Sequence, residues 1–350
     1  MPRLRRVDCC SPGITRRRRG RGFEYLDGNG QRITDAEVLA RMRGLAIPPA
    51  WRDVWICTWP AGHIQATGTD AAGRKQYRYH DAWREHRDRE KFDSMVEFAR
   101  ALPRLRRRVA RDLRGDELSR ERVLGCATRL LDRGFFRIGS EGYAEENDTY
   151  GLATIRKQHV TLGDGVIVFD YESKGGKRRV QSIADSDIHA LLVTLRRRRS
   201  GGSELLAYKD GRRWTDVRST DINEYVRGAT GGAFTAKDFR TWNATVLAAV
   251  ALAVSAEAAR GSRTARKRAI KRAVDETARY LGNTPAVCRA SYIDPRVFDR
   301  FDGGLTIGGA LPEVAEPEAS AWPAVQRPVE EAVVGLIAGD ASAEGVERVT

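Results

Sequence analysis

Apolar and polar positions follow different patterns in the first 90 residues and in the rest of the chain. Between residues 23 and 83, short runs of β-branched and aromatic side chains, such as 54–59 (VWICTW), are separated by turn signals such as 27–30 (DGNG). Runs of this length between Gly and Asn or Asp are typical of β-strands. We therefore expect a small β-rich domain over residues 21–90, ending in a charged stretch that is a linker or an exposed helix start.

From residue 92 onward the apolar residues recur with helical spacing. Segments 123–131, 246–254 and 269–278 place apolar residues three or four positions apart, as one face of a helix requires. A strand pattern interrupts them at 159–183, with turns at 163–165 and 173–177. This pattern predicts a mainly α-helical domain over residues 91–310 with a small antiparallel β-hairpin insertion, whose second turn carries Lys174.

Both ends of the chain differ in composition from these two domains. Residues 1–20 are basic and include four arginines at 16–19, whereas residues 311–350 are rich in Ala, Glu and Pro. Segments of such composition commonly stay disordered, so we expect a basic flexible tail at one end and an acidic flexible tail at the other. The predicted fold class is α+β, with a β-rich N-terminal domain and a larger helical domain.

Positive charge is concentrated in residues 1–310. The 350 residues include 61 Lys and Arg against 47 Asp and Glu, a net charge of +14. Residues 311–350 hold eight acids and two bases, a net of −6, so the other 310 residues carry +20. A surplus of this size favours a polyanionic partner such as nucleic acid, although a merely basic soluble protein would show the same total.

Other classes of function have little support in the sequence. The five cysteines include no CxxC pair, which disfavours a zinc site or a disulfide framework, and no GxxxxGK(S/T) phosphate loop is present. Segment 185–187 (DSD) is better explained as a helix N-cap than as metal ligands. The longest apolar stretch, 246–254, is too short to span a bilayer. We expect a cytoplasmic, nucleoid-associated protein that needs no metal and no nucleotide cofactor.

One tyrosine late in the helical region is preceded by groups suited to phosphoryl transfer. The tyrosine is Tyr292, and the groups are Arg137, Lys174, Arg240 and Asn283. Tyrosine is a weak nucleophile at neutral pH because its pKa is about 10. It becomes effective when cations stabilise the negative charge of a pentavalent phosphorane. Two arginines for the oxygens, a lysine for the leaving group and an attacking tyrosine predict metal-free cleavage and rejoining of DNA.

Five motifs in order carry a resemblance to a known family. They are IPPAWRDVWI at 47–56, GHIQATGTDAAGRKQYRYH at 62–80, RIGSEGYAEENDTYGLATI at 137–155, KDFRTWNAT at 237–245 and the Tyr292 segment. From about Phe23 to about Phe301 the chain resembles the poxvirus-like bacterial branch of type IB DNA topoisomerases. The resemblance implies a monomer that forms a clamp around duplex DNA. It also implies relaxation of supercoils by transient single-strand cleavage through a 3′-phosphotyrosyl intermediate, followed by religation, without ATP or metal.

The same resemblance implies roles for four residues of this set. Tyr292 would be the nucleophile, since it follows Asn283 by nine positions, the spacing found in this superfamily. Arg137 and Arg240 would clamp the transition state, whereas the alternative for Arg137 is a structural ion pair with Glu141 or Glu145. Asn283 replaces the histidine of the poxvirus enzymes, and its amide can donate a hydrogen bond but cannot titrate.

Three lysines are candidates for contact with the leaving strand or the DNA backbone. Lys174 would be the general acid for the 5′-oxygen, and the two glycines after it allow the turn to enter a groove closely. A basic hairpin tip is otherwise ordinarily just solvated, and Lys177 is the competing candidate. Lys237 lies three residues before Arg240 on the same helical face, and we expect it to contact DNA.

The segment around residue 77 is the main candidate for DNA binding outside the catalytic set. Gln76 and Arg78 would share one face of a strand, with Tyr77 and Tyr79 on the other. By resemblance, Gln76, Tyr77 and Tyr79 contact the major groove or the backbone of duplex DNA. The remaining candidates for DNA contact are Arg74, Lys75 and Tyr143. The alternative for this segment is a sheet that packs its tyrosines inward.

Two other functions compete with this interpretation. A tyrosine recombinase or integrase would use the same Arg–Lys–Arg–Tyr chemistry. Recombinases usually carry His at the positions of Lys237 and Asn283, however, and their N-terminal domains are helical, unlike the strand-rich region here. A basic chromosome-organising protein that is not an enzyme would leave Tyr292 unexplained.

Overall fold

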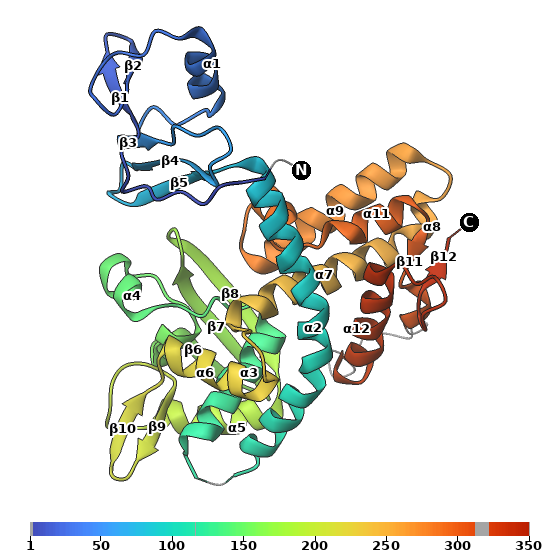
Figure 1. Ribbon diagram of the computed structural model, residues 1–350. Helices are drawn as coiled ribbons and strands as arrows, with labels where there is room; N and C mark the ends of the chain where they lie inside the picture. The colour runs from blue at the N-terminus through green and yellow to red at the C-terminus, as the bar shows by residue number, and fades with distance from the viewer. Residues whose placement is uncertain (1–2, 116, 312–321, 350) are drawn as a thin grey trace. The chain divides into compact units, whose positions relative to one another are not determined.

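The computed structural model describes residues 3–115, 117–311 and 322–349 (Figure 1). The chain divides into two units, Met1–Phe92 and Asp93–Thr350, and the division falls within helix α2 (Asp81–Leu113). The boundary that the sequence suggested, between residues 90 and 91, lies two residues away from this division.

A five-stranded antiparallel sheet forms most of the first unit. Its strands are β1 (Ile14–Arg19), β2 (Gly22–Leu26), β3 (Arg52–Ile56), β4 (Ile64–Thr69) and β5 (Lys75–Tyr79), in the spatial order β2-β1-β3-β4-β5. Helix α1 (Ala36–Gly44) begins after Asp35, whose carboxylate accepts hydrogen bonds from the first-turn amides, as an N-cap does. The small core of the unit consists of Ile14, Met42, Val54, Ile56 and Ala66. Strand β5 is at the edge of the sheet and is therefore open on one side.

The prediction of a flexible tail over residues 1–20 is wrong for Ile14–Arg19, which form β1. Arg16 donates a hydrogen bond of 2.9 Å to the Trp51 carbonyl oxygen. Arg17 pairs with Glu24 at 2.7 Å. A run of arginines can therefore form a strand, because neighbouring carbonyl groups and one carboxylate accept hydrogen bonds from its side chains.

Helices dominate the second unit. After α2 they are α3 (Arg120–Gly134), α4 (Glu141–Asn147), α5 (Ser186–Arg197), α6 (Ser219–Thr230), α7 (Ala236–Val254), α8 (Ala256–Ala259), α9 (Arg263–Leu281), α10 (Pro285–Ser291), α11 (Pro295–Asp302) and α12 (Trp322–Ala338). Helix α7 contacts α3, α9 and α12, and side chains on most of its faces are buried. A side chain on α7 can therefore be held in the interior of the unit.

Short antiparallel strands accompany these helices. Strands β6 (Val160–Gly163), β7 (Val166–Ser173) and β8 (Lys177–Ala184) form a three-stranded sheet, while β9 (Ala207–Asp210) pairs with β10 (Arg213–Asp216) and β11 (Leu305–Thr306) with β12 (Glu347–Arg348). The small N-terminal sheet and the larger helical region confirm the expected mixed class. The β9–β10 and β11–β12 pairs were not predicted from the sequence.

The prediction of a flexible acidic tail over 311–350 is also wrong where the structure describes that segment. Residues 322–338 form α12, and its apolar side chains pack into the main core of the second unit. The buried positions are Val329, Ala332, Val333, Leu336 and Ile337. They recur three and four residues apart, so the helical signal was present but the Ala, Glu and Pro content obscured it. Residues 312–321 lie outside the described part of the chain.

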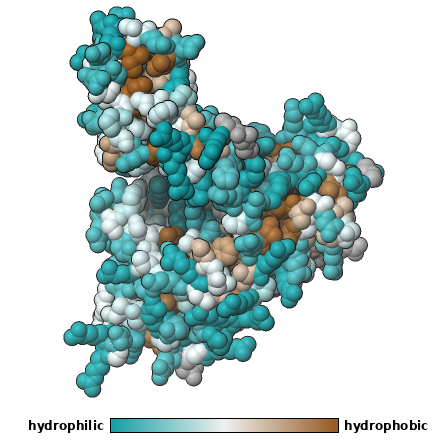
Figure 2. Space-filling model, viewed as in Figure 1, coloured by the Kyte–Doolittle hydropathy of each residue, from teal (hydrophilic) through white to brown (hydrophobic). Residues whose placement is uncertain are grey.

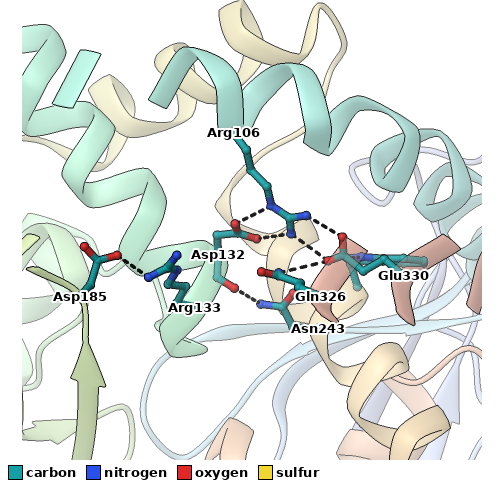
Figure 3. Close-up of polar contacts among 8 residues, drawn as sticks. Arg106, Asp132, Arg133, Asp185, Asn243, Gln326 and Glu330 are labelled. Atoms are coloured by element: carbon teal, nitrogen blue, oxygen red, sulfur yellow. Dashed lines mark hydrogen bonds and ion pairs between the residues drawn. The ribbon is translucent and has the colours of Figure 1, made fainter. Parts of the chain in front are cut away.

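A buried ion-pair cluster joins α12 to the rest of the unit (Figure 3). Arg106 of α2 donates to Asp132 of α3 at 2.8 Å and to Glu330 of α12 at 2.6 Å. Trp242 of α7 donates to Glu330 at 3.3 Å, and Asn243 donates to the Asp132 carbonyl oxygen at 2.9 Å. Residues of four helices are therefore joined in one hydrogen-bonded network, which we call the Arg106 cluster.

Hydrophilic residues cover most of the face shown in Figure 2 on each unit, in keeping with a chain that is 31% charged residues. Among the described helices, none combines the length and the apolar character needed to cross a membrane.

Candidate active site

Arg137 lies in the irregular segment that follows α3. Phe135 ends the helix in a left-handed conformation, and the main chain of 137–138 then pairs with 152–153 through hydrogen bonds of 2.8 and 2.7 Å. A side chain on Gly139 would meet the Gly151 backbone at 2.8 Å, so this close approach requires glycine. The loop holds Arg137 so that its Nη2 donates to the Gly282 carbonyl oxygen at 3.0 Å.

Arg240 is held inside the unit near the start of α7. The helix begins after Thr235, whose amide donates to the Asp238 carboxylate at 2.7 Å. Nη1 of Arg240 donates to the Phe135 carbonyl oxygen at 2.5 Å, and Nη2 donates to the Leu281 carbonyl oxygen at 2.9 Å. Arg240 is only 4% exposed, so these two carbonyl groups fix the plane of its guanidinium group.

Asn283 and Tyr292 lie at the two ends of the short helix α10. Gly282 caps α9 in a left-handed conformation (φ 65°), and the backbone N–H of Asn283 donates to the Ala278 carbonyl oxygen at 3.0 Å. Helix α10 then returns the chain to Tyr292, whose ring centroid lies 5.2 Å from Cζ of Arg240. The four residues expected from separate motifs therefore come together at the junction of α3, α7, α9 and α10.

Three buried donors in this cluster have no hydrogen-bond partner among the described residues. They are Nη1 of Arg137, Nε of Arg240 and Nδ2 of Asn283. Because Arg137 is only a donor, its 2.5 Å hydrogen bond assigns the amide oxygen to the side of Asn283 that faces it, and the amide nitrogen points elsewhere. Buried donors are ordinarily paired, so an anion with several acceptor atoms would complete this site.

The electrostatics of the site lower the pKa of Tyr292. Burial raises the pKa of Tyr292, but the charge of Arg240, with smaller effects of Asn283 and Arg137, lowers it to a net value below the ordinary one. Burial and repulsion from Arg137 lower the pKa of Arg240, while Tyr292 raises it, and the net pKa is below its usual value. No carboxylate pairs with Arg137 or Arg240 in the described part of the chain.

Lys174 is not in contact with this cluster in the described residues. It is exposed on the turn between β7 and β8, followed by Gly175 and Gly176 at φ 83° and 68°. Its Nζ lies 6.0 Å from the ring centroid of Tyr143 on α4. Lys177, the competing candidate, is also exposed at the start of β8. Lys237 is exposed in the first turn of α7, three residues from the buried Arg240.

The DNA-binding candidates of the first unit follow β5. Tyr77 and Tyr79 are 44% and 36% exposed, and their rings stack at a centroid distance of 6.0 Å. The alternative that these tyrosines pack inward is therefore wrong. Gln76 donates to Asp70 at 2.9 Å, and Arg74 pairs with the same carboxylate at 2.9 Å. Lys75 lies over the Tyr77 ring at 5.7 Å.

Two residues near the site were missed from the sequence. Thr245, one helical turn beyond Arg240 on α7, donates to the Tyr292 carbonyl oxygen at 3.4 Å and accepts from the Asp294 amide at 3.1 Å. Arg179 on β8 lowers the pKa of Arg240 by its charge. Thr245 is within the KDFRTWNAT motif, so its position was a usable signal, whereas Arg179 is part of a KRR run that resembles a solvated strand end.

Comparison with known proteins identifies the family. Residues 80–301 match the catalytic core of eukaryotic DNA topoisomerase I, and residues 22–70 match the N-terminal domain of bacterial DNA topoisomerase IB. The chain is 33% identical to the DNA topoisomerase 1B of Acanthamoeba polyphaga mimivirus over 291 residues, which covers 80% of this chain and 85% of the viral protein. The chain belongs to the type IB DNA topoisomerases, as its motifs suggested.

More distant relatives are longer than this chain. It is 25% identical to the DNA topoisomerase 1 of Schizosaccharomyces pombe over 256 residues, 67% of this chain and 28% of the yeast protein. It is 28% identical to the DNA topoisomerase 1 of Candidozyma auris over 159 residues, 45% of this chain and 20% of that protein. Membership of the family makes this protein a DNA topoisomerase, an isomerase that acts on duplex DNA, and favours that function over the recombinase and non-enzymatic alternatives.

Proposed function

We propose that this topoisomerase relaxes supercoiled duplex DNA by cutting and rejoining one strand through Tyr292. The observation that carries the proposal is a set of three buried donors, from Arg137, Arg240 and Asn283, that have no partner among the described residues and lie beside a tyrosine whose pKa is lowered. The non-bridging oxygens of a phosphodiester match this set in charge and in hydrogen-bonding capacity. Their negative charge grows in the transition state, where preorganised donors stabilise it most.

The proposed step exchanges one phosphodiester for another. Tyr292 Oη forms a bond to phosphorus while the bond from phosphorus to the 5′-oxygen breaks, which leaves a 3′-phosphotyrosine and a free 5′-hydroxyl. The tyrosine proton passes to solvent, and the departing 5′-oxygen takes a proton from Lys174. Rejoining is the reverse reaction, so the step needs no energy from ATP.

The role of Lys174 requires the β7–β8 turn to approach the bound strand. The pair Gly175–Gly176 follows Lys174 in conformations that side chains rarely adopt, and glycine lets a backbone come close to a ligand. The charge of Lys174 is exposed and has no carboxylate partner among the described residues. We infer that bound DNA supplies its partner.

The β5 edge of the first unit is the proposed second contact with duplex DNA. Tyr77 and Tyr79 present stacked, exposed rings, and Gln76 and Lys75 offer donors beside them. Polar and aromatic side chains on such a strand suit base edges and backbone phosphates. With both units on the duplex, the protein would act as a monomeric clamp.

The direct test is relaxation of positively and negatively supercoiled plasmid in EDTA without ATP. We expect complete relaxation by the wild-type protein at substoichiometric amounts. Mass spectrometry of trapped complexes should place the 3′-phosphate on Tyr292. A strict requirement for magnesium or ATP, or an adduct on a different tyrosine, would contradict the mechanism, and exchange of strands between two DNA sites would indicate a recombinase.

A further inference from the structure

Arg179 is a third guanidinium group beside the proposed phosphate site. It lies on β8 opposite Tyr171 of β7. Its Nε donates to Gln181 at 2.6 Å, and its Nη2 donates to the Tyr280 carbonyl oxygen near the end of α9. These two hydrogen bonds hold the side chain against the segment that carries Asn283.

Gly282 separates Arg179 from Arg137. A methyl group on Gly282 would lie 2.8 Å from Nη1 of Arg179 and 3.6 Å from Nη1 of Arg137. Both nitrogen atoms therefore face the space beside this glycine. Two cations this close repel each other, and burial followed by the charge of Arg137 lowers the pKa of Arg179, although Tyr171 partly opposes these effects.

The Nη1 group of Arg179 is available to a ligand. Nε and Nη2 donate to Gln181 and Tyr280, the Tyr171 phenol is the other polar neighbour of the side chain, and no carboxylate pairs with it within the described residues. Unlike Nη1 of Arg137, Nη1 of Arg179 is not among the fully enclosed, unpartnered atoms. Arg179 also lines an open cavity of about 400 Å³ together with Phe135 and Tyr280.

The adjacent Arg178 shows what a purely structural arginine on this strand looks like. Its side chain is 74% exposed and pairs with Asp170 of β7 at 2.6 Å. Arg179, one residue later, points to the opposite side of the sheet, where its polar neighbours are the Gln181 and Tyr280 oxygens and the Tyr171 phenol. The two neighbours differ in charge balance, and only Arg179 lacks a counterion in the described part of the chain.

We propose that Arg179 binds the DNA phosphodiester adjacent to the one that Tyr292 attacks. This inference rests on the proposed function. In the proposed function, three fully buried donors bind the scissile phosphate. Nη1 of Arg179 lies beside Arg137 but nearer the surface. Successive phosphates follow one another along the strand with a rise of about 3.4 Å, so neighbouring phosphates can meet neighbouring guanidinium groups. The expected effect is on positioning of the strand and not on the chemical step itself.

The test combines Arg179→Met with substrates in which one phosphate is replaced by an uncharged methylphosphonate. On ordinary DNA we expect the variant to raise the half-saturating DNA concentration for single-turnover cleavage about 10-fold or more, as for loss of a charged hydrogen bond, with little change in the maximal rate. A methylphosphonate at the adjacent position should weaken wild-type binding by a similar factor. The same methylphosphonate should cause little further loss in Arg179→Met, because the contact is already absent.

Arg178→Met is the matched control and should behave like the wild-type protein on every substrate. Arg179→Lys should recover part of the loss, since it keeps the charge but not the fork. The inference is overturned if Arg179→Met loses affinity equally on all methylphosphonates, which would indicate a structural role through Tyr280, or if it is unimpaired. The inference would also be overturned if the effect of Arg179→Met disappeared only with a methylphosphonate at the scissile phosphate and not with one at the adjacent phosphate. Failure of the proposed function would look different, because the wild-type protein itself would then form no Tyr292 adduct.

Discussion

The second unit contains two arginine clusters that differ in their partners: carboxylates surround the arginine of one, and uncharged oxygens surround the arginines of the other. In the Arg106 cluster all three guanidinium nitrogens donate to the carboxylates of Asp132 and Glu330, at 2.6 to 2.8 Å. At the candidate active site, Arg240 and Arg137 donate to carbonyl and amide oxygens, and one nitrogen of each has no partner among the described residues. Each cluster combines buried and partly buried groups, since Asp132, Glu330 and Arg240 are buried and Arg106 and Arg137 are partly buried, so burial alone does not distinguish them.

The difference appears in the pKa values. Burial lowers the pKa of Arg106, but Asp132 and Glu330 outweigh it, and the net pKa is well above the usual value. The net pKa of Arg240 is below its usual value, because burial and the neighbouring Arg137 act in the same direction. The charge of an arginine paired with carboxylates is compensated within the fold, whereas an arginine without a counterion leaves a positive charge that an anionic ligand could compensate.

The largest effect is expected from removing the Tyr292 hydroxyl, which lies beside the arginines that have no carboxylate partner. Tyr292→Phe keeps the ring over Arg240 but lacks the attacking oxygen, so cleavage and the covalent adduct should be lost completely while DNA binding stays near normal. Denaturing gels of trapped complexes and a DNA-binding assay measure the two properties. Tyr280→Phe is the matched control, because Tyr280 is 50% exposed, and it should still form the adduct. An adduct in Tyr292→Phe would assign the nucleophile elsewhere.

The next prediction tests whether Arg137 and Arg240 are sufficient for DNA cleavage without Lys174. If Lys174 is the general acid, Lys174→Ala should slow cleavage of an ordinary phosphodiester by about 10²–10⁴-fold. A 5′-bridging sulfur leaves readily without a proton, so cleavage of that substrate should be largely restored. Arg137→Ala should gain no such rescue, since its partners are the non-bridging oxygens. Equal impairment of Lys174→Ala on both substrates would point to Lys177 or Lys237.

The third effect compares the two clusters directly. Arg240→Ala should slow single-turnover cleavage by about 10²–10³-fold, because a transition-state donor is lost, and should remove repulsion with Arg137. Arg106→Met should instead lower the free energy of unfolding by about 3–5 kcal/mol, because two buried carboxylates lose their partner. Denaturant unfolding and cleavage rates, measured on both variants, separate the two effects.

The exposed pair of Arg327 and Glu331 provides the control for that comparison. Its two side chains are 71% and 61% exposed, so Arg327→Met should change the free energy of unfolding by no more than about 1 kcal/mol. If Arg106→Met proves as mild as Arg327→Met, then charge balance does not identify a structural arginine in this protein. If Arg240→Ala unfolds the protein without slowing the cleavage that remains, Arg240 belongs with Arg106.

These two clusters also show how far the sequence could lead. Apolar spacing predicted the segments that became α3, α7 and α9, because each buries one or more continuous faces. Turn signals and β-branched runs predicted the β6–β8 sheet. Motifs carried Arg137, Arg240, Asn283 and Tyr292, and the structure brings all four together.

What the sequence did not predict depends on contacts between distant segments. The composition of the arginine run in β1 predicts disorder, because the sequence does not show that Glu24 and the Trp51 carbonyl group lie beside it. Glu330 read as part of an acidic tail, because nothing local shows that Arg106 meets it from 224 positions away. Arg178 and Arg179 are alike in sequence, and only the pairing of β7 with β8 shows that Arg178 pairs with Asp170 while Arg179 pairs with no carboxylate among the described residues.

The smallest expected effect concerns pH and depends on the sign of the Tyr292 shift. The net pKa of Tyr292 is below that of an ordinary tyrosine, which is about 10. The folded protein therefore releases this proton at lower pH than the unfolded chain does, so ionisation of Tyr292 adds stability above the unfolded pKa. That contribution disappears as the pH falls through the folded pKa. The free energy of unfolding of the wild-type protein, relative to Tyr292→Phe, should consequently rise between neutral pH and about pH 10.

Replacing the cation that causes the shift should reverse this trend. Arg240→Met removes the largest favourable charge and leaves the burial of the phenol, so ultraviolet titration should show Tyr292 ionising above the wild-type value. Arg106→Met should leave the Tyr292 titration where it is, because the side chains that lower the pKa of Tyr292 are Arg240, Asn283 and Arg137 and do not include Arg106. An identical shift in both variants would mean that the phenol responds to the total charge of the unit, and the distinction between a neutralised and an unneutralised arginine would then lose its electrostatic basis.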